Sequence, residues 1–223
     1  MLNIIFIIAT FSVVLLSLSN TEAQLNSYYN LTPNDIKEKC INNNFNLTKL
    51  KLNYNEMINF VFGETKRELS IENALKTDDN CMGDLNITNI LQNGFQIIMQ
   101  NCLKDDISLS DDDIKVLIRQ SLDKLCAVTR FILFKHHLST CIDEDYHENC
   151  LENVLKSANL TPETLENGAE FANLGLKYSP KGKKTSEDIF DCFSYSIEKC
   201  SAEEKETEKK LVSRIKDTIK VRN

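Results

Sequence analysis

Leu122–Leu138, LDKLCAVTRFILFKHHL, lies near the middle of the 223-residue chain and decides its fold. Drawn as a helix, this segment carries apolar side chains on most of its sides. A helix at the surface of a globular protein has one apolar stripe, whereas a helix that is apolar nearly all round is buried. The segment therefore predicts a central helix that other helices surround.

The sequence before this segment predicts helices that pack on it. Ser110 and Asp113 resemble a capping box and place a helix start ahead of the central segment. Apolar residues in Ile87–Cys102 recur at steps of three and four, as in an amphipathic helix. Asn93-Gly94 lies inside that stripe, so we predict a local bend there in place of a hairpin turn. Thr32-Pro33 offers a cap and a first-turn proline, which predict another helix.

The sequence after the central segment continues in the same way, with one interruption. Lys177–Lys184, KYSPKGKK, is charged and contains Pro and Gly, which predicts an exposed loop. Ser201–Glu204 resembles a capping box and predicts the start of the last helix. Further helices are predicted over Asp143–Leu155, from Thr161-Pro162, and from Thr185 or Ser186 to about Lys199.

The composition agrees with helices throughout. Only 3 prolines and 6 glycines interrupt the chain, and no segment alternates as a strand would. About 200 residues remain after the N-terminal segment described next, enough for one domain with its own core. We predict an all-α fold: a signal peptide over 1–23, and a single helical bundle, stapled by disulfides, over 24–223.

The N-terminus predicts export. Ile4–Leu18 is an uncharged apolar run, shorter than the roughly 20 residues that span a membrane. Thr21-Glu22-Ala23 fits a small-x-small cleavage site, which assigns 1–23 to a signal peptide removed before Gln24. The alternative is an uncleaved membrane anchor. No second run of spanning length follows, so we predict a secreted mature chain without a membrane span.

All eight cysteines follow the predicted cleavage site. An even number of cysteines in an exported chain predicts a disulfide framework. Eight cysteines allow 105 pairings, and the sequence does not select among them. The cysteines are Cys40, Cys81, Cys102, Cys126, Cys141, Cys150, Cys192 and Cys200.

Four Asn-x-Ser/Thr sequons also follow the cleavage site, and they predict N-glycosylation. Each modified side chain has to lie on the surface. The acceptors are Asn30, Asn46, Asn86 and Asn159.

Three cysteine-containing segments resemble a known family. They are Ile36–Cys40 (IKEKC), Leu109–Cys126, and Asp191–Cys200 (DCFSYSIEKC). Together they are similar to insect hemolymph glycoproteins that are named after a mass of about 27 kDa. The resemblance implies a secreted, glycosylated, helical protein of body fluids without an established activity, and it transfers no site residues.

Insect odorant-binding proteins offer an analogy for mechanism. Cys141 and Cys150 enclose eight residues, a spacing those small helical carriers share. The chain has no Cys-x-x-x-Cys and is longer than they are, so we do not place it in that family.

One group of residues has the chemistry of a metal site. The three histidines of the chain lie close to an acidic run, but the spacing fits no recognised zinc motif. We prefer a solvated helix end followed by an acidic turn, and predict no metal or other cofactor. The group is His136, His137, His147, Asp143, Glu144, Asp145 and Glu148.

Other motifs also favour structural interpretations. Asp111–Asp113 lacks the spacing of a calcium loop and fits the negative charge preferred at a helix start. Lys181–Lys184 could be a processing site or an anion contact, but a solvated loop is preferred. Paired cysteines offer no nucleophile, and serine-hydrolase and phosphate-loop motifs are absent from the sequence. A net charge of −7 disfavours nucleic acid as a partner.

Three functions remain open. We prefer a non-enzymatic glycoprotein of insect extracellular fluid that carries a small apolar ligand. A cavity lined by Phe95, Ile98, Phe131 and Phe134 would favour the carrier, although the Phe131–Phe134 stripe is more often core. The alternative is a secreted effector, such as an immune, salivary or venom component that acts on another protein, marked by a large exposed apolar patch. A hydrolase would require His147 and carboxylates to converge in a cleft.

Overall fold

The computed structural model describes residues 24–64, 81, 84–138, 140–160 and 174–222, and helices are the regular elements of these residues. The all-α fold class is therefore confirmed. Residues 1–23 and the helix predicted from Thr161-Pro162 lie outside the described residues, so the signal peptide and the domain boundary after Ala23 stay predictions. A short helix over 24–29 precedes the main elements. These are α2 (Pro33–Asn42), α3 (Thr48–Glu64), α6 (Leu85–Asn101), α7 (Asp111–His137), α8 (Glu144–Ala158), α10 (Pro180–Ser196) and α11 (Ala202–Thr218).

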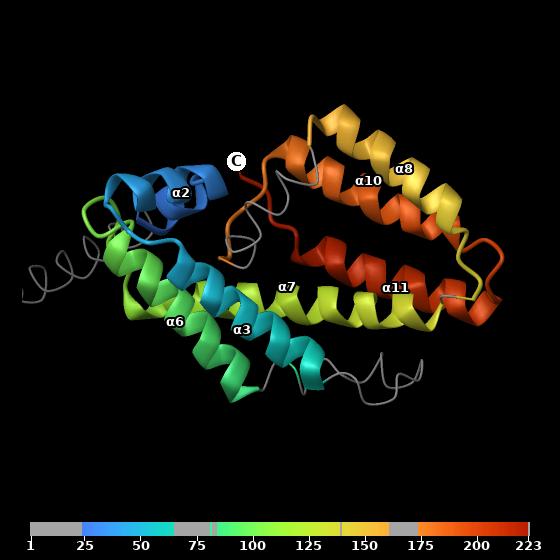
Figure 1. The fold of residues 1–223 in the computed structure, drawn as a ribbon, viewed down its shortest axis with the longest axis horizontal. Helices are drawn as coiled ribbons and strands as arrows, with labels where there is room; N and C mark the ends of the chain where they lie inside the picture. Colours follow the sequence, from blue (N-terminus) through green and yellow to red (C-terminus); the bar gives the residue numbers. More distant parts are fainter. Residues whose placement is uncertain (1–23, 65–80, 82–83, 139, 161–173, 223) are drawn as a thin grey trace, which may run out of the picture.

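Helix α7 is the central helix that the sequence predicts. Its 27 residues make it roughly 40 Å long at the α-helical rise. Figure 1 shows α3 and α6 crossing one half of α7 while α11 runs alongside the other half, with α8 and α10 beyond α11. Because its two halves meet different helices, α7 needs apolar side chains on most of its sides.

The buried side chains form two clusters, and α7 contributes to both. The N-terminal cluster includes Leu117, Leu122 and Leu125 of α7, and the C-terminal cluster includes Phe131 and Phe134. The N-terminal cluster further contains Tyr28, Tyr29, Ile36, Cys40, Leu50, Met57, Ile87, Ile90, Leu91, Phe95, Ile98, Cys102, Leu103, Ile107, Ile118, Cys126 and Leu174. The C-terminal cluster further contains Ala127, Leu138, Phe193, Ile197, Cys200, Leu211, Val212 and Ile215.

Gly94 allows α3 to pack closely on α6. A Cβ atom at Gly94 would lie 2.8 Å from Oδ1 of Asn53, so the Asn53 side chain would have to shift away from α6. The amide Nδ2 of Asn53 donates a hydrogen bond to the carbonyl of Ile90 at 3.1 Å. Helix α6 continues through Asn93-Gly94, so the dipeptide forms no turn, as predicted.

The capping residues act as the sequence predicts. Thr32 caps α2 and Ser201 caps α11, each in a reciprocal capping box with the residue three positions later. Ser110 accepts a hydrogen bond from the backbone N–H of Asp113 at 3.2 Å, and the Asp113 carboxylate accepts one from the N–H of Ser110 at 3.0 Å. These hydrogen bonds fix where the helices begin and, with them, the faces that meet.

The prediction of a loop over Lys177–Lys184 is wrong for its second half, and so is the predicted cap at Thr185 or Ser186. Helix α10 begins at Pro180, and Ser179 accepts a hydrogen bond from the N–H of Gly182 at 3.0 Å. The basic residues lie in the first turns and pair with acidic residues four positions on: Lys183 with Glu187 at 3.7 Å and Lys184 with Asp188 at 2.9 Å. The Ser179 cap, Pro180 at the first helical position and these ion pairs stabilise the helix more than Gly182 destabilises it.

None of the helices in the described part of the chain combines the length and the apolar character needed to cross a bilayer.

Candidate functional site

Four disulfides join the eight cysteines and supply the pairing that the sequence leaves open. Two hold the N-terminal half and two the C-terminal half. The pairs are Cys40–Cys102, Cys81–Cys126, Cys141–Cys200 and Cys150–Cys192, and no described cysteine is free. A cysteine in a disulfide has no thiolate, so these residues provide neither a nucleophile nor a metal ligand.

Each disulfide links elements that are distant in the chain. Cys150–Cys192 joins α8 to α10 across 42 residues, and Cys40–Cys102 joins α2 to the end of α6 across 62 residues. In the chain-entropy treatment, loops of this length correspond to about 4 kcal/mol of stabilisation each. The helix pairs α2–α6 and α8–α10 are thus covalently fixed.

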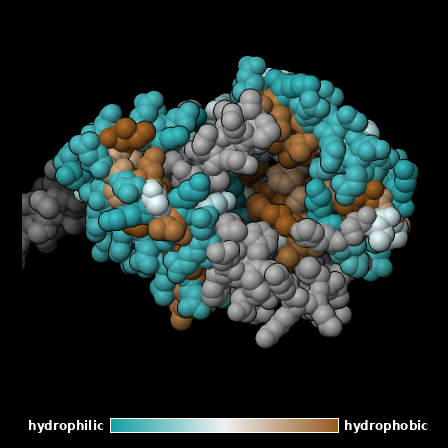
Figure 2. Space-filling model, in the orientation of Figure 1, coloured by the Kyte–Doolittle hydropathy of each residue, from teal (hydrophilic) through white to brown (hydrophobic). Residues whose placement is uncertain are grey.

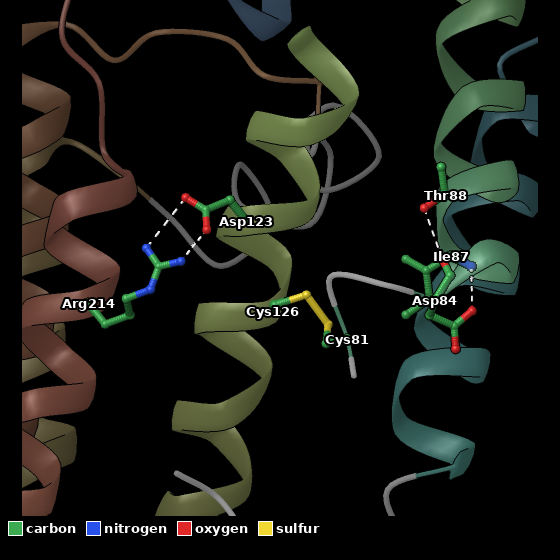
Figure 3. Close-up of a disulfide and its surroundings, with 7 residues drawn as sticks. All are labelled: Cys81, Asp84, Ile87, Thr88, Asp123, Cys126 and Arg214. Atoms are coloured by element: carbon green, nitrogen blue, oxygen red, sulfur yellow. Dashed lines mark hydrogen bonds and ion pairs between the residues drawn. A yellow bond between two sulfur atoms is a disulfide. The ribbon is translucent and has the colours of Figure 1, made fainter. Parts of the chain in front are cut away.

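Helix α7 is tied on two sides. Figure 3 shows Cys126 of α7 bonded to Cys81, while Asp123 of the same helix forms a two-pronged ion pair with Arg214 of α11. The first tie lies on the side of α6 and the second on the side of α11. Together they hold the central helix between the two halves of the molecule.

His147 differs most from the solvated helix end and acidic turn that the sequence favours for the histidine and acid group. It lies on α8, and its side chain is only 8% exposed. Its Nε2 atom lies 3.3 Å from Nζ of Lys135 on α7, and its ring packs edge-on against Phe193 of α10 at 5.7 Å between centroids. The ammonium group of Lys135 therefore lies next to Nε2, one of the two ring nitrogens. His147 therefore joins α7, α8 and α10.

The electrostatic surroundings of His147 favour its neutral form. Burial is the largest cause, and the charge of Lys135 the second, of a pKa below the ordinary value of 6.5. Glu144, Glu148 and the backbone of Cys192 act in the opposite sense, more weakly. The Nδ1 atom is buried and has no hydrogen-bond partner among the described residues.

The rest of the predicted histidine and acid group does not converge. His137 is exposed at the end of α7, and the side chain of His136 is outside the described part. Asp143 caps α8 and pairs with Lys199 at 3.0 Å. Glu144, Asp145 and Glu148 are exposed on α8. The carboxylates thus lie in solvent and not against the histidine ring. Among the described residues, one group of potential ligands does lie together, but it consists of Cys141 and Cys200, whose sulfurs are bonded to each other, and Glu204.

Glu208 is a buried carboxyl group that the sequence reasoning missed. It is 4% exposed on α11 and accepts a hydrogen bond from Oγ of Ser194 on α10 at 2.5 Å. Burial raises its pKa above the ordinary 4.5, and the Ser194 bond and Lys216 offset part of that rise. Its position, three and four residues before Leu211 and Val212 on the buried face, was the available signal.

The remaining charged motifs are structural. Asp111–Asp113 forms the first turn of α7, as predicted, and Asp112 pairs with Lys115 at 2.9 Å. All four sequon asparagines, Asn30, Asn46, Asn86 and Asn159, are exposed, which the predicted glycosylation requires.

The cavity lined by Phe95, Ile98, Phe131 and Phe134 that would favour a carrier does not form among the described residues. Phe95 and Ile98 belong to the N-terminal cluster, whereas Phe131 and Phe134 belong to the C-terminal cluster, and each is at most 8% exposed. These side chains pack against their own clusters because they face different helices.

An apolar hollow lies elsewhere. Figure 2 shows hydrophobic surface inside a depression between α10 and the α7–α11 pair, with hydrophilic surface to its right in this view. At this junction Phe131 of α7 packs edge-on against Phe193 at 4.8 Å and against Phe190 at 5.3 Å, both of α10. Phe190 and Val128 are only partly buried against the C-terminal cluster. The helix pair α8–α10 thus meets α7–α11 through an aromatic joint that lies beside this apolar surface.

Comparisons with known proteins give no match: no family model, curated protein or solved structure is similar to this chain.

Proposed function

We propose that this chain is a secreted, non-enzymatic glycoprotein of insect extracellular fluid, similar to hemolymph proteins, and that it carries a small apolar ligand. The observation that carries the proposal is the apolar hollow between α10 and the α7–α11 pair (Figure 2). A hydrophobic depression suits a ligand that is itself apolar. The four disulfides and the resemblance of the cysteine segments to insect hemolymph glycoproteins support export into an oxidising fluid.

The disulfides around the hollow favour a preformed carrier site over a site that folds only when its ligand binds. Cys141–Cys200 and Cys150–Cys192 hold the helices that border the hollow. A framework fixed before binding reduces the ordering entropy that a ligand has to overcome.

An effector that acts on another protein is the second candidate, and the surface favours it less. A docking face for a protein is marked by a contiguous apolar patch. Here the large exposed hydrophobic residues of the described part lie on six different helices: Ile41, Leu52, Leu85, Val116, Tyr146 and Tyr195.

Binding of a neutral fluorescent probe tests the proposal. The full chain secreted from insect cells is titrated with N-phenyl-1-naphthylamine, and native mass spectrometry of the same material reports a co-purified small molecule. We expect saturable binding at one site and about tenfold weaker binding in Phe190→Ala, since that ring is partly buried at the joint. Tyr195→Ala on the same helix is the control, because Tyr195 is 61% exposed. Absence of both probe binding and a co-purified ligand would refute the carrier function.

A further inference from the structure

A shallow groove follows the line where α3 packs on α6. Two adjoining depressions, of about 400 and 830 Å³, share Leu52 and Glu56 of α3 and Asn93 of α6. We call them the amide groove, because uncharged amide side chains dominate their lining. Its principal residues are Leu52, Asn55, Asn86, Asn89, Asn93 and Gln96.

The lining matches the chemistry of a carbohydrate. An amide side chain offers both donors and an acceptor, which suits the hydroxyl groups of a sugar, each of which also donates and accepts. Leu52 is 63% exposed between these amides, and the C–H face of a sugar ring could cover it. The preponderance of uncharged groups favours a neutral ligand over an ion.

One end of the groove already carries an attachment point. Asn86 lines the larger depression, is exposed, and is the acceptor of the sequon Asn86-Ile87-Thr88. A glycan attached there would start inside the groove. From Asn86 to Gln100, α6 extends roughly 21 Å at its helical rise, which is room for several sugar residues.

We propose that the N-linked glycan of Asn86 folds back along the amide groove and covers Leu52. In its attachment, Nδ2 of Asn86 loses one proton and bonds to the anomeric carbon of the first sugar, whose lipid diphosphate carrier leaves. A tethered ligand has an effective concentration in the millimolar range, so weak contacts in a shallow groove suffice to hold it. The amide groove contains the charged residues Lys49 and Glu56. The sequon at Asn46 is less suited, because the smaller depression next to it has Lys104 and Asp105 in addition to Lys49.

The test uses the full chain secreted from insect cells. Glycopeptide mass spectrometry first establishes that Asn86 is occupied. Hydrogen exchange of α3 is then compared between the wild type and Asn86→Gln, which keeps the backbone hydrogen bond to Asp84. We expect exchange in α3 to become about threefold faster, or more, without the glycan. Thr88→Ser, which preserves the sequon, and Asn30→Gln, which removes a sequon outside the groove, should leave α3 unchanged.

A second variant separates docking from attachment. Leu52→Ser should accelerate exchange in α3 of the glycosylated protein and have no such effect in the Asn86→Gln background, because the sugar no longer covers that side chain. Two results would each overturn the proposal: an unmodified Asn86 in the secreted protein, or an occupied Asn86 with equal α3 exchange in the wild type and Asn86→Gln. Neither result bears on the apolar hollow, which is independent of this groove.

Discussion

The two clusters on α7 differ in what they bury. The N-terminal cluster is apolar, and the hydroxyl of its fully buried Tyr28 donates to the carbonyl of Leu174 at 2.8 Å. The C-terminal half contains most of the buried polar groups of the described residues. The buried polar residues of the C-terminal half are Thr129, Arg130, His147, Ser196, Thr207 and Glu208, and Ser121 lies outside this half.

This difference separates two sources of stability. Packing of apolar groups does not depend on protonation, so the buried core of the N-terminal half should respond to cavities and little to pH. The C-terminal half buries two titratable groups, His147 and Glu208. The pKa of His147 lies below its ordinary value, and that of Glu208 lies above its ordinary value. The stability of this half should therefore depend on pH.

Removal of a single disulfide, tested separately in each half, should change the free energy of unfolding the most. We expect the pair Cys150→Ala with Cys192→Ala to lose about 4 kcal/mol of unfolding free energy, because the loop it closes spans 42 residues. Urea denaturation measures the loss. Hydrogen exchange should locate it in α8 and α10.

The matched variant is Cys40→Ala with Cys102→Ala, which closes a comparable loop in the N-terminal half. We expect a loss of similar size, about 4 kcal/mol, but faster exchange in α2 and α6. If either variant loosened both halves equally, the two clusters would unfold as one unit and the comparison would fail.

Acid should weaken the C-terminal half through His147. A histidine whose pKa is lower in the folded state binds fewer protons there than when unfolded. Its contribution is complete above pH 6.5 and is lost as pH falls from 6.5 toward the folded pKa. We expect the contribution of His147 to lower the free energy of unfolding as pH falls from 7 to 5, measured by urea denaturation at each pH.

Two substitutions identify the source of that loss. His147→Phe keeps an aromatic ring against Phe193 and should remove most of the loss between pH 7 and pH 5. Lys135→Met removes the neighbouring charge and should reduce it. His137→Gln, at the exposed end of α7, is the control and should retain the acid sensitivity of the wild type. Equal acid sensitivity in all four proteins would disprove the role of His147.

The sequence predicts the helices better than it predicts which of their faces meet. Leu122–Leu138 and the capping boxes at Ser110 and Ser201 are local signals, and the structure confirms them. The start of α10 at Pro180 was also encoded locally, by Ser179 and Pro180, but the adjacent glycine and lysines suggested a loop. The prediction was wrong because we gave the composition of the segment more weight than the helix cap formed by Ser179 and Pro180.

The candidate site was less predictable, because it depends on which helices pack against each other and through which faces. Phe95 and Phe131 look alike in the sequence, yet they enter different clusters. Burial of His147 follows from the packing of α8 on α10, and its spacing before Cys150 on the same face was the only local hint. The disulfide pairing required the three-dimensional structure, since all 105 combinations are equally compatible with the spacing.

Glu208 should give the smallest effect, and its sign opposes that of His147. A carboxyl group whose pKa is raised in the folded state stabilises at low pH, and that contribution is lost as pH rises above 4.5 through the folded pKa. Glu208→Gln keeps an acceptor for Ser194 and removes the buried charge. We therefore expect Glu208→Gln to be more stable than the wild type at pH 7.4, by less than about 1 kcal/mol, and equal to it near pH 4.

Glu204→Gln, one turn earlier on α11, is the matched control with the opposite sign. Its carboxylate accepts a hydrogen bond from the backbone N–H of Ser201 at 2.7 Å, and the hydrogen bonds with Ser201 lower its pKa. The substitution should slightly destabilise the protein at pH 7.4, because a charged acceptor at a helix start is lost. If the two variants shifted the unfolding free energy in the same direction, burial would not be what distinguishes Glu208, and the C-terminal half would owe its pH dependence to His147 alone.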